Sequence, residues 1–550
     1  MNLVLTQTKG LVLLTLACAP LYYILKKITR NSLHNVPGPK STSWLYGHFS
    51  ELYGKKGRQP AVQAELAAKY GSTFSMQSLF GMRQLYTFDP KAMHYIFVKD
   101  CMSYEEPDAI LRLIHVVFGP GILATALGDH HRKQRKILSP AFSVAHMKEQ
   151  VPIFYEVAHK VQNSLIKQVK DGPKEVDMSS WMSRTALELI GQAGLGYSFD
   201  DLEENTRKDP FAHAIKALTP ILGRLAGVSF LVFPWASRFG TPGFRRFVCS
   251  LFPWWKDLQE AKNYADDLWR MSTDIFRARK KVLEMGDEEA KQYVGRGRDV
   301  LSLLLKENMK ATNEDRLTEE ELIAQMTTLI NAATDTTSTG ISQTLHLLAT
   351  RPDVQRKLRE EIDEAFQDGD PSYEKLVSLP YLDAIERETL RMYPPFSRII
   401  RVAKHDVVLP LSTPVIGVDG FPINEIAVPK NTEIHCSVTN GNRNPDVWGP
   451  DGAEWKPERW LQPLPKSVMD ANMPGVYSHL MTFSAGQRSC IGFKFSQLEM
   501  KVVLALLVKT FEFSDAGKDI FWELTPITSP SVKGTGRPGM PIIVNLVKRD

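Results

Sequence analysis

A short segment around Cys490 constrains the fold of this 550-residue chain more than any other feature of its sequence. Residues 483–492 read FSAGQRSCIG and match the spacing F-x-x-G-x-R-x-C-x-G. Average residue frequencies give about 10⁻⁴ expected chance matches to these five fixed positions in a chain of this length. In the stretch that follows, Phe493 to Lys509, apolar residues recur with helical spacing. The sequence therefore predicts a tight loop that carries a cysteine just before a helix.

This context gives the Cys490 thiol a specific chemistry. The N-terminus of a helix offers free N–H groups and a positive dipole end, and both stabilise a thiolate. A thiolate is a good axial ligand for haem iron, where it favours O–O cleavage. Gly486 and Gly492 let the backbone turn and approach a flat macrocycle without a Cβ clash. Phe483 can pack on the thiolate side and Arg488 can pair with a haem propionate, so we expect haem b with Cys490 as its metal ligand.

Charge and the remaining cysteines exclude other classes of protein. The net charge of +5 is spread over 67 basic and 62 acidic residues, which is too dilute for a nucleic-acid-binding surface. The other cysteines are scattered and form no C-x-x-C pair, which argues against a disulfide framework or a structural zinc site. These four cysteines are Cys18, Cys101, Cys249 and Cys436.

Three further segments carry recognisable spacing. Residues 332–337 read AATDTT and place an acid beside an alcohol inside an apolar helix, where both compete for backbone hydrogen bonds. Glu388 and Arg391 stand at i,i+3 spacing on one helical face. Residues 128–135 read GDHHRKQR and place His131 and Arg135 one helical turn apart.

Together with the cysteine loop, these segments resemble the motifs of the cytochrome P-450 haem-thiolate monooxygenases, in the family's order. The resemblance runs from Val36 to the C-terminus, and the chain looks most like filamentous-fungal members of the microsomal type. It implies that Thr336 holds a water or the distal oxygen and that Asp335 relays protons from solvent. The family's usual second-position glycine is Ala333 here, so the helix distortion that opens an oxygen groove must tolerate a methyl group.

The resemblance also implies a buried structural cluster and a set of propionate contacts. Glu388 and Arg391 correspond to the family's E-x-x-R pair, which Arg459 completes as a structural lock beneath the haem. His131 stands where the family often has tryptophan, and Arg135 keeps the family's arginine. Arg401 matches a further contact to a propionate, and bidentate geometry favours arginine for this task.

The implied function is the insertion of one oxygen atom from O2 into an apolar small molecule, such as a terpenoid, steroid, fatty acid or aromatic compound. The segments that would face the substrate are largely apolar and have no charge cluster for a phosphate or a sugar acid. Electrons would come from a separate NADPH-dependent cytochrome reductase, docked on a basic face with Lys494, Lys501 and Arg443. An O2-independent haem isomerase or dehydratase, or a non-enzymatic haem-binding protein, are the alternatives, and the retained Asp335-Thr336 pair argues against both.

The N-terminus predicts a membrane anchor. Residues 10–25 are uncharged, and a tilted helix from about Leu3 to Leu25 would span a bilayer. Basic residues follow between positions 26 and 30, so the positive-inside rule places the catalytic domain in the cytosol, here at the endoplasmic reticulum membrane. A cleaved signal peptide is the alternative, because residues 17–19 resemble a cleavage site. Aromatic stretches at residues 230–235 and 252–255 predict either core packing or a second contact with lipid.

The pattern of the whole chain predicts a mainly α fold with a small β portion (α+β). We expect an anchor over residues 1–30 and one haem domain over residues 31–550. Two strands are predicted near residues 73–79 and 84–88, and a long helix over 318–350 begins with a capping box at Thr318. Short helical patterns fill residues 61–176, and residues 308–313 are predicted to form an exposed loop.

Overall fold

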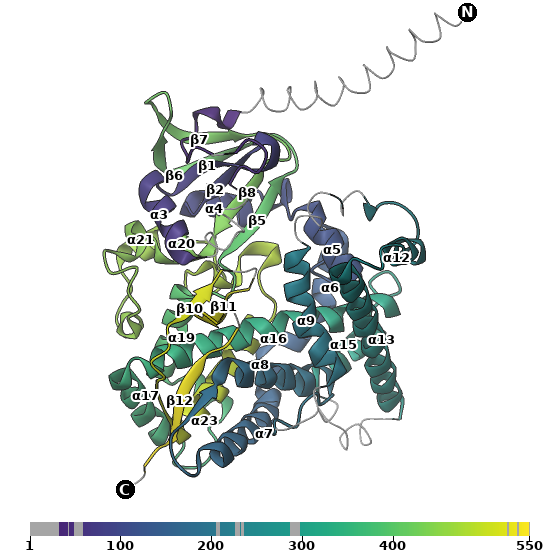
Figure 1. Ribbon diagram of the computed structural model, residues 1–550, viewed down its shortest axis with the longest axis vertical. Helices are drawn as coiled ribbons and strands as arrows, with labels where there is room; N and C mark the ends of the chain where they lie inside the picture. The colour runs from purple at the N-terminus through teal and green to yellow at the C-terminus, as the bar shows by residue number, and fades with distance from the viewer. Residues whose placement is uncertain are drawn as a thin grey trace, which may run out of the picture.

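The computed structural model describes residues 32–41, 43–48, 59–204, 209–225, 232, 236–285, 298–524, 527–535 and 538–548. Over this part of the chain the fold is mainly helical with small sheets, as predicted (Figure 1). The predicted anchor, residues 1–30, lies outside the described residues. None of the helices that the structure describes is long and apolar enough to cross a bilayer.

The helices fill most of the molecule. Their bounds are α3 Pro60–Tyr70, α4 Pro90–His94, α5 Asp108–Phe118, α6 Asp129–Leu138, α7 Val144–Val169, α8 Met178–Leu189, α9 Pro210–Arg224, α12 Pro242–Ser250, α13 Lys256–Glu284, α15 Val300–Lys310, α16 Glu319–Ala349, α17 Pro352–Ala365, α18 Tyr373–Val377, α19 Pro380–Met392, α20 Val438–Arg443, α21 Pro445–Trp448, α22 Lys466–Asp470 and α23 Phe493–Thr510. Short 3-10 and π turns join several of them, among them η3 Tyr95–Lys99, η8 Met481–Phe483 and η9 Gly486–Arg488.

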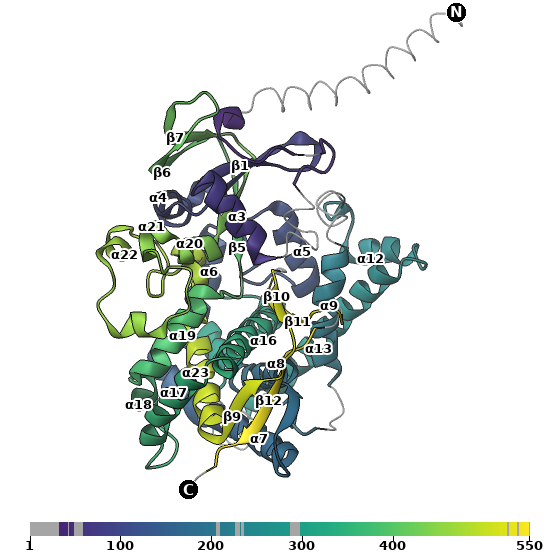
Figure 2. The same cartoon turned by 60° about the vertical axis from the view of Figure 1, so that its left-hand side comes forward.

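The strands form four small sheets, and the largest lies at one end of the molecule (Figures 1 and 2). That sheet has the order β1-β2-β8-β5-β3, in which β2 and β8 are parallel and the other neighbours are antiparallel. The remaining sheets are β4-β12-β9, β6-β7 and β10-β11. The strand bounds are β1 Thr73–Gln77, β2 Arg83–Thr87, β3 Tyr104–Glu105, β4 Lys174–Asp177, β5 Arg398–Ala403, β6 Val407–Ile416, β7 Pro422–Val428, β8 Glu433–Ser437, β9 Phe511–Asp515, β10 Ile520–Glu523, β11 Ser529–Val532 and β12 Pro541–Leu546.

The long helix α16 runs through the middle of the helical part and contacts α8, α13, α19 and α23 (Figure 2). Its start is the predicted capping box: Thr318 accepts a hydrogen bond from the Glu321 N–H, and the Glu321 carboxylate accepts one from the Thr318 N–H. Most of its residues are buried, which explains why its polar side chains look out of place in the sequence. The predicted helix and the two predicted strands are confirmed.

Two local predictions were wrong. The short helical patterns of residues 61–176 include one long helix, α7, which continues through Pro152 because its apolar face packs on α23. The Phe154 ring meets the Phe495 ring edge-on, with centroids 5.1 Å apart. The loop predicted at residues 308–313 begins only after Lys310, because the Asn308 side chain is buried and bonds the backbone of Leu317 in both directions.

A buried ion pair ties α19 to the chain that leads to the cysteine loop. Arg391 and Glu388 are fully buried and form two hydrogen bonds of 2.8 Å. Arg391 also donates to the carbonyls of Asn442, Gly452 and Glu454. These bonds satisfy both charges, as a buried pair requires.

Arg459 lies next to this pair. Its Nε is 3.6 Å from a Glu388 carboxylate oxygen, while its other nitrogens bond the side chain and the carbonyl of Asp451. Glu388 instead accepts its remaining hydrogen bonds from the Lys456 N–H and the Trp460 Nε1–H. The structure thus brings the three predicted structural residues together, with Asp451 as the main partner of Arg459.

We expect Arg391→Ala to lower the free energy of unfolding by about 3–5 kcal/mol, because Glu388 is left charged and buried without its partner. Denaturant unfolding followed by circular dichroism measures this change. The control is Lys466→Ala, which removes a largely exposed lysine whose nearest acid, Asp470, is 4.0 Å away. Equal stability of the two variants would contradict a structural role for Arg391.

Candidate active site

The cysteine loop connects η8 to α23 and is closed by its own backbone. The Cys490 N–H donates to the Phe483 carbonyl at 2.9 Å, and the Ser489 N–H donates to the Gly486 carbonyl at 3.1 Å. Phe483 packs between the rings of Tyr477 and Phe493, with centroid distances of 5.5 and 6.0 Å. Cys490 therefore stands three residues before the first residue of α23, as the sequence predicts.

The two glycines of the loop have different surroundings in the protein. Gly486 has φ +63°, and a Cβ atom there would lie 1.9 Å from the carbonyl oxygen of Phe97 in η3. Only glycine fits this approach of two backbones. Gly492 has no such neighbour, since a Cβ atom would meet only the Phe142 ring, at 3.7 Å.

The Cys490 thiol lies beside a backbone donor and a cation. Its side chain is accessible, yet burial in the surrounding chain raises its pKa. A hydrogen bond from the Gly492 backbone and the charge of Arg135 act in the opposite direction. An accessible thiol enclosed by protein, with an N–H donor and a cation beside it, fits a ligand for a bound metal group.

Arg135 holds the residue before the cysteine. From α6, its guanidinium donates to the Ser489 carbonyl at 2.7 Å and to the Ser489 hydroxyl at 3.0 Å. His131, one turn earlier on α6, is buried, and burial together with Arg488 and Arg135 lowers its pKa to about 4. His131 is therefore neutral at physiological pH and can act as a hydrogen-bond donor without adding charge.

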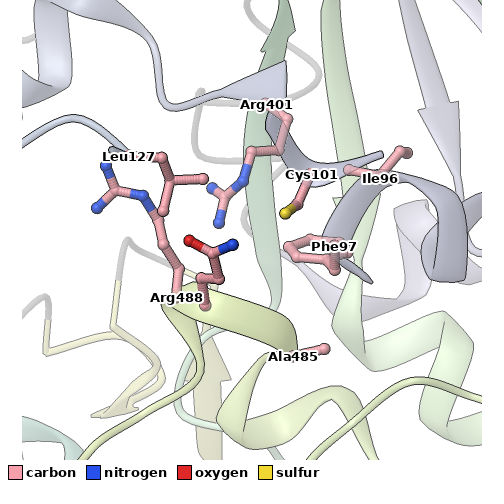
Figure 3. Close-up of a pocket in the computed structure, with 8 residues that line it drawn as sticks. Ile96, Phe97, Cys101, Leu127, Arg401, Ala485 and Arg488 are labelled. Atoms are coloured by element: carbon pink, nitrogen blue, oxygen red, sulfur yellow. The ribbon is translucent and has the colours of Figure 1, made fainter. Parts of the chain in front are cut away.

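Arg401 and Arg488 line a cavity of ≈ 10 Å³ between the large sheet and the cysteine loop. Figure 3 shows that Arg401 approaches it from β5 and Arg488 from the loop, with Phe97 and Cys101 on the η3 side. Arg488 donates to a Glu105 carboxylate oxygen and to the Thr125 carbonyl, both at 2.8 Å, and its buried Nε makes no hydrogen bond among the described residues. Arg401 lies 3.4 Å from Glu106 and 5.0 Å from the centre of the Phe97 ring.

Sequence reasoning missed Glu105 and Glu106. Glu105 is the last residue of β3 and Glu106 follows it, and they supply the carboxylates that Arg488 and Arg401 bind. Arg401 and Arg488 thus pair with two carboxylates, and Arg135, close to the same His131, adds a third positive charge that leaves a cationic excess for an anionic group. The adjacent acids were visible in the sequence, but nothing local indicates that they meet residues about 300 and 380 positions away.

The AATDTT segment lies in an unbroken part of α16. The Thr336 hydroxyl donates to the Ala332 carbonyl at 2.6 Å, which leaves the hydroxyl oxygen free to accept a hydrogen bond. Asp335 and Thr336 are both half-buried, and the helix continues without a break past Ala333. The structure thus places an acid and an acceptor hydroxyl side by side in the central helix.

The predicted basic docking face is only partly present. Lys494 is exposed at the start of α23. Lys501 is instead buried, with its Nζ 2.6 Å from Asp383, and the Arg443 guanidinium binds the Met392 carbonyl. The prediction for these two residues was wrong because both point into the protein.

Comparison with known proteins agrees with this site. A family model of cytochrome P-450 matches residues 36–523. The chain is 45% identical over 538 residues to cytochrome P-450 monooxygenase 91 of Postia placenta, covering 97% of this chain and 98% of that protein. It is 41% identical over 540 residues to a ganoderic acid synthetase of Ganoderma lucidum, covering 96% and 98%. Since the resemblance to fungal members is confirmed over nearly the whole length, the chain belongs to the cytochrome P-450 family and is a cytochrome P-450 monooxygenase.

Proposed function

We propose that Cys490 is the axial ligand of haem b and that the enzyme inserts one atom of O2 into an apolar small molecule. NADPH and a proton would supply the two electrons and two hydrogens that convert the other oxygen atom to water. The haem supplies the iron at which O2 is activated. The observation that carries the proposal is the accessible Cys490 thiol, enclosed by protein beside an N–H donor and Arg135.

The protein residues have separate tasks around this group. Arg135, Arg401 and Arg488 would bind its carboxylates, and neutral His131 would donate a hydrogen bond to one of them. Arg488 has a spare buried Nε–H for this purpose. Lys494, exposed near the cysteine loop, is our candidate contact for an acidic face on a separate NADPH-dependent reductase.

Asp335 and Thr336 would deliver protons on the substrate side. The Thr336 oxygen can accept a hydrogen bond from water, and the half-buried Asp335 can exchange protons with solvent. An O2-independent isomerase or dehydratase has no need for such a pair, which is why we favour the monooxygenase reaction for this chain.

The substrate is proposed to be apolar, with terpenoids, steroids, fatty acids and aromatic compounds as the classes to test. Helices α5 and α16 are in contact, and their partly buried side chains include the apolar residues Leu113, Ile114, Leu329 and Ala333. Such a lining selects for hydrophobic area more than for a charged group.

A CO difference spectrum of the reduced protein tests the haem ligand. We expect a strongly red-shifted Soret band in the wild type and its complete loss in Cys490→Ala, because only a thiolate ligand shifts the band in this way. Cys249→Ala, which changes a half-buried thiol of α12, serves as the control and should keep the band. An unchanged band in Cys490→Ala would overturn the assignment.

Replacement of the acid and the alcohol tests proton delivery. We expect Asp335→Asn and Thr336→Val to lower product formed per NADPH consumed by about 10²-fold, the usual range for loss of a positioned proton donor. Thr336→Ser should retain most of the product formed per NADPH consumed. Thr334→Val removes a buried hydroxyl that donates to the Ile330 carbonyl within its own helix, and it should stay close to the wild type. If Thr336→Val forms as much product per NADPH as the wild type, the role of Thr336 in proton delivery is excluded.

Membrane attachment is proposed through residues 1–30 together with the aromatic surface at α12. Residues 230–235, apart from Val232, lie outside the described residues, but residues 252–255 are described. Helix α12 lies at the edge of the molecule (Figure 1). In and just after it, large apolar side chains are exposed: Phe244, Phe247, Leu251 and Trp254, the last with 76% exposure. An exposed apolar patch of this kind is typical of a contact with lipid.

Brominated lipids test this contact in vesicles that carry the full-length protein. Bromine quenches tryptophan fluorescence at close range, so we expect Trp254→Phe to lose a measurable share of the quenching seen in the wild type. Trp448→Phe, which removes a buried tryptophan, should lose none. If quenching in Trp254→Phe equals that of the wild type, Trp254 does not touch the bilayer.

A further inference from the structure

Helix α23 carries a buried acid that no role described above uses. Glu499 is fully buried, and neither of its carboxyl oxygens makes a hydrogen bond to any described residue. Burial raises its pKa well above the ordinary value for glutamate, and only Thr337 acts in the opposite direction. A charged carboxylate in an apolar core without a partner is very unfavourable, so burial favours the neutral carboxylic acid at Glu499.

The group that faces Glu499 is the third threonine of the AATDTT segment, Thr337. Thr337 is buried, and its hydroxyl also makes no hydrogen bond among the described residues. Its neighbours on α16 behave differently: the hydroxyls of Thr334, Thr336 and Thr344 each donate to the carbonyl four residues earlier. The Thr337 hydroxyl is therefore available to a partner outside its own helix.

The two helices are closely packed at this point. A Cβ atom on Gly340, three residues after Thr337, would lie 3.0 Å from the sulfur of Met500, the residue after Glu499. Buried polar groups are almost always hydrogen-bonded, directly or through an ordered water. Two such groups that face one another across a tight interface satisfy this rule most simply by bonding to each other.

We propose that Glu499 is a positioning residue: as a neutral acid it exchanges hydrogen bonds with Thr337, directly or through one internal water, and so sets the rotation of the α16 turn that presents Asp335 and Thr336. The carboxyl O–H donates to the Thr337 oxygen, and the Thr337 O–H donates to the carboxyl C=O. Both donors and both acceptors are then used. The functional part of this inference rests on the role proposed for Asp335 and Thr336.

A second buried glutamate provides a matched control. Glu386 on α19 is also fully buried with no hydrogen bond to its carboxyl oxygens among the described residues, and burial raises its pKa to about 8. Its neighbours are different, however, since Lys501 lies 3.8 Å away and Asp383 is close by. Glu386 thus shares the burial of Glu499 but lacks its contact with the AATDTT segment.

Infrared spectroscopy of the full-length haem-loaded protein tests the hydrogen bond without measuring turnover. The difference spectrum of wild type minus Glu499→Gln should contain the C=O stretching band of a protonated carboxyl group. Thr337→Val should shift that band to higher frequency, because the C=O loses a donor. The same Thr337→Val variant should not shift the band of Glu386, which the difference spectrum of wild type minus Glu386→Gln identifies. Absence of the Glu499 band, or no shift in Thr337→Val, would overturn the proposal.

The product formed per NADPH consumed, called the coupling, tests whether the Glu499 contact sets the rotation of the α16 turn. We expect Glu499→Gln, which keeps a donor and an acceptor, to stay within about twofold of the wild type. Glu499→Leu and Thr337→Val should each lose at least about fivefold and release more H2O2. The double variant should be no worse than Glu499→Leu, because both changes remove one interaction. Glu386→Gln should couple as the wild type does.

Two results contradict the positioning role: equal losses in Glu499→Gln and Glu499→Leu, or additive losses in the double variant. Thr337→Val nearly keeps the shape of the side chain, so this variant still tests the positioning role if Glu499→Leu fails to fold. Failure of the proposed proton delivery is distinguishable, since Thr336→Val would then retain coupling while the infrared shift in Thr337→Val still reports the Glu499 contact.

Discussion

The buried charge of Arg391 is the constraint on which the cysteine side of the molecule depends. A guanidinium cannot lose its proton in a protein, so every N–H it carries into the core needs an acceptor. Arg391 finds these in Glu388 and in carbonyls between residues 442 and 454. Segments that are far apart in the sequence are therefore held to α19 by one charge.

The same network reaches the cysteine loop. Asn442 donates to the Thr482 hydroxyl and accepts from the Met481 N–H, both at 2.8 Å, and the Thr482 hydroxyl donates to the Leu390 carbonyl. Thr482 directly precedes Phe483, whose carbonyl accepts from the Cys490 N–H. A path of hydrogen bonds and one peptide bond thus leads from the buried ion pair to the candidate metal ligand and ties the cysteine loop to α19.

Features with a local cause could be predicted from the sequence. The capping box at Thr318, the strands β1 and β2 and the helix after Cys490 all follow from neighbouring residues. Features that depend on distant partners could not be predicted. Nothing near Lys501 indicates that Asp383 buries it, and nothing near Arg488 points to Glu105. The burial of Glu499 could not be predicted either, because it depends on how α16 and α23 pack.

The contact between Gly486 and Phe97 has a consequence for how this protein can vary. The contact joins two backbones, so it is indifferent to which side chains η3 carries. Substitutions at the exposed positions of η3, Val98 and Lys99, leave the carbonyl in place, whereas an inserted or deleted residue would move it away from the loop. Engineered variants can therefore change the composition of this turn at those positions, but its length is tied to the cysteine loop.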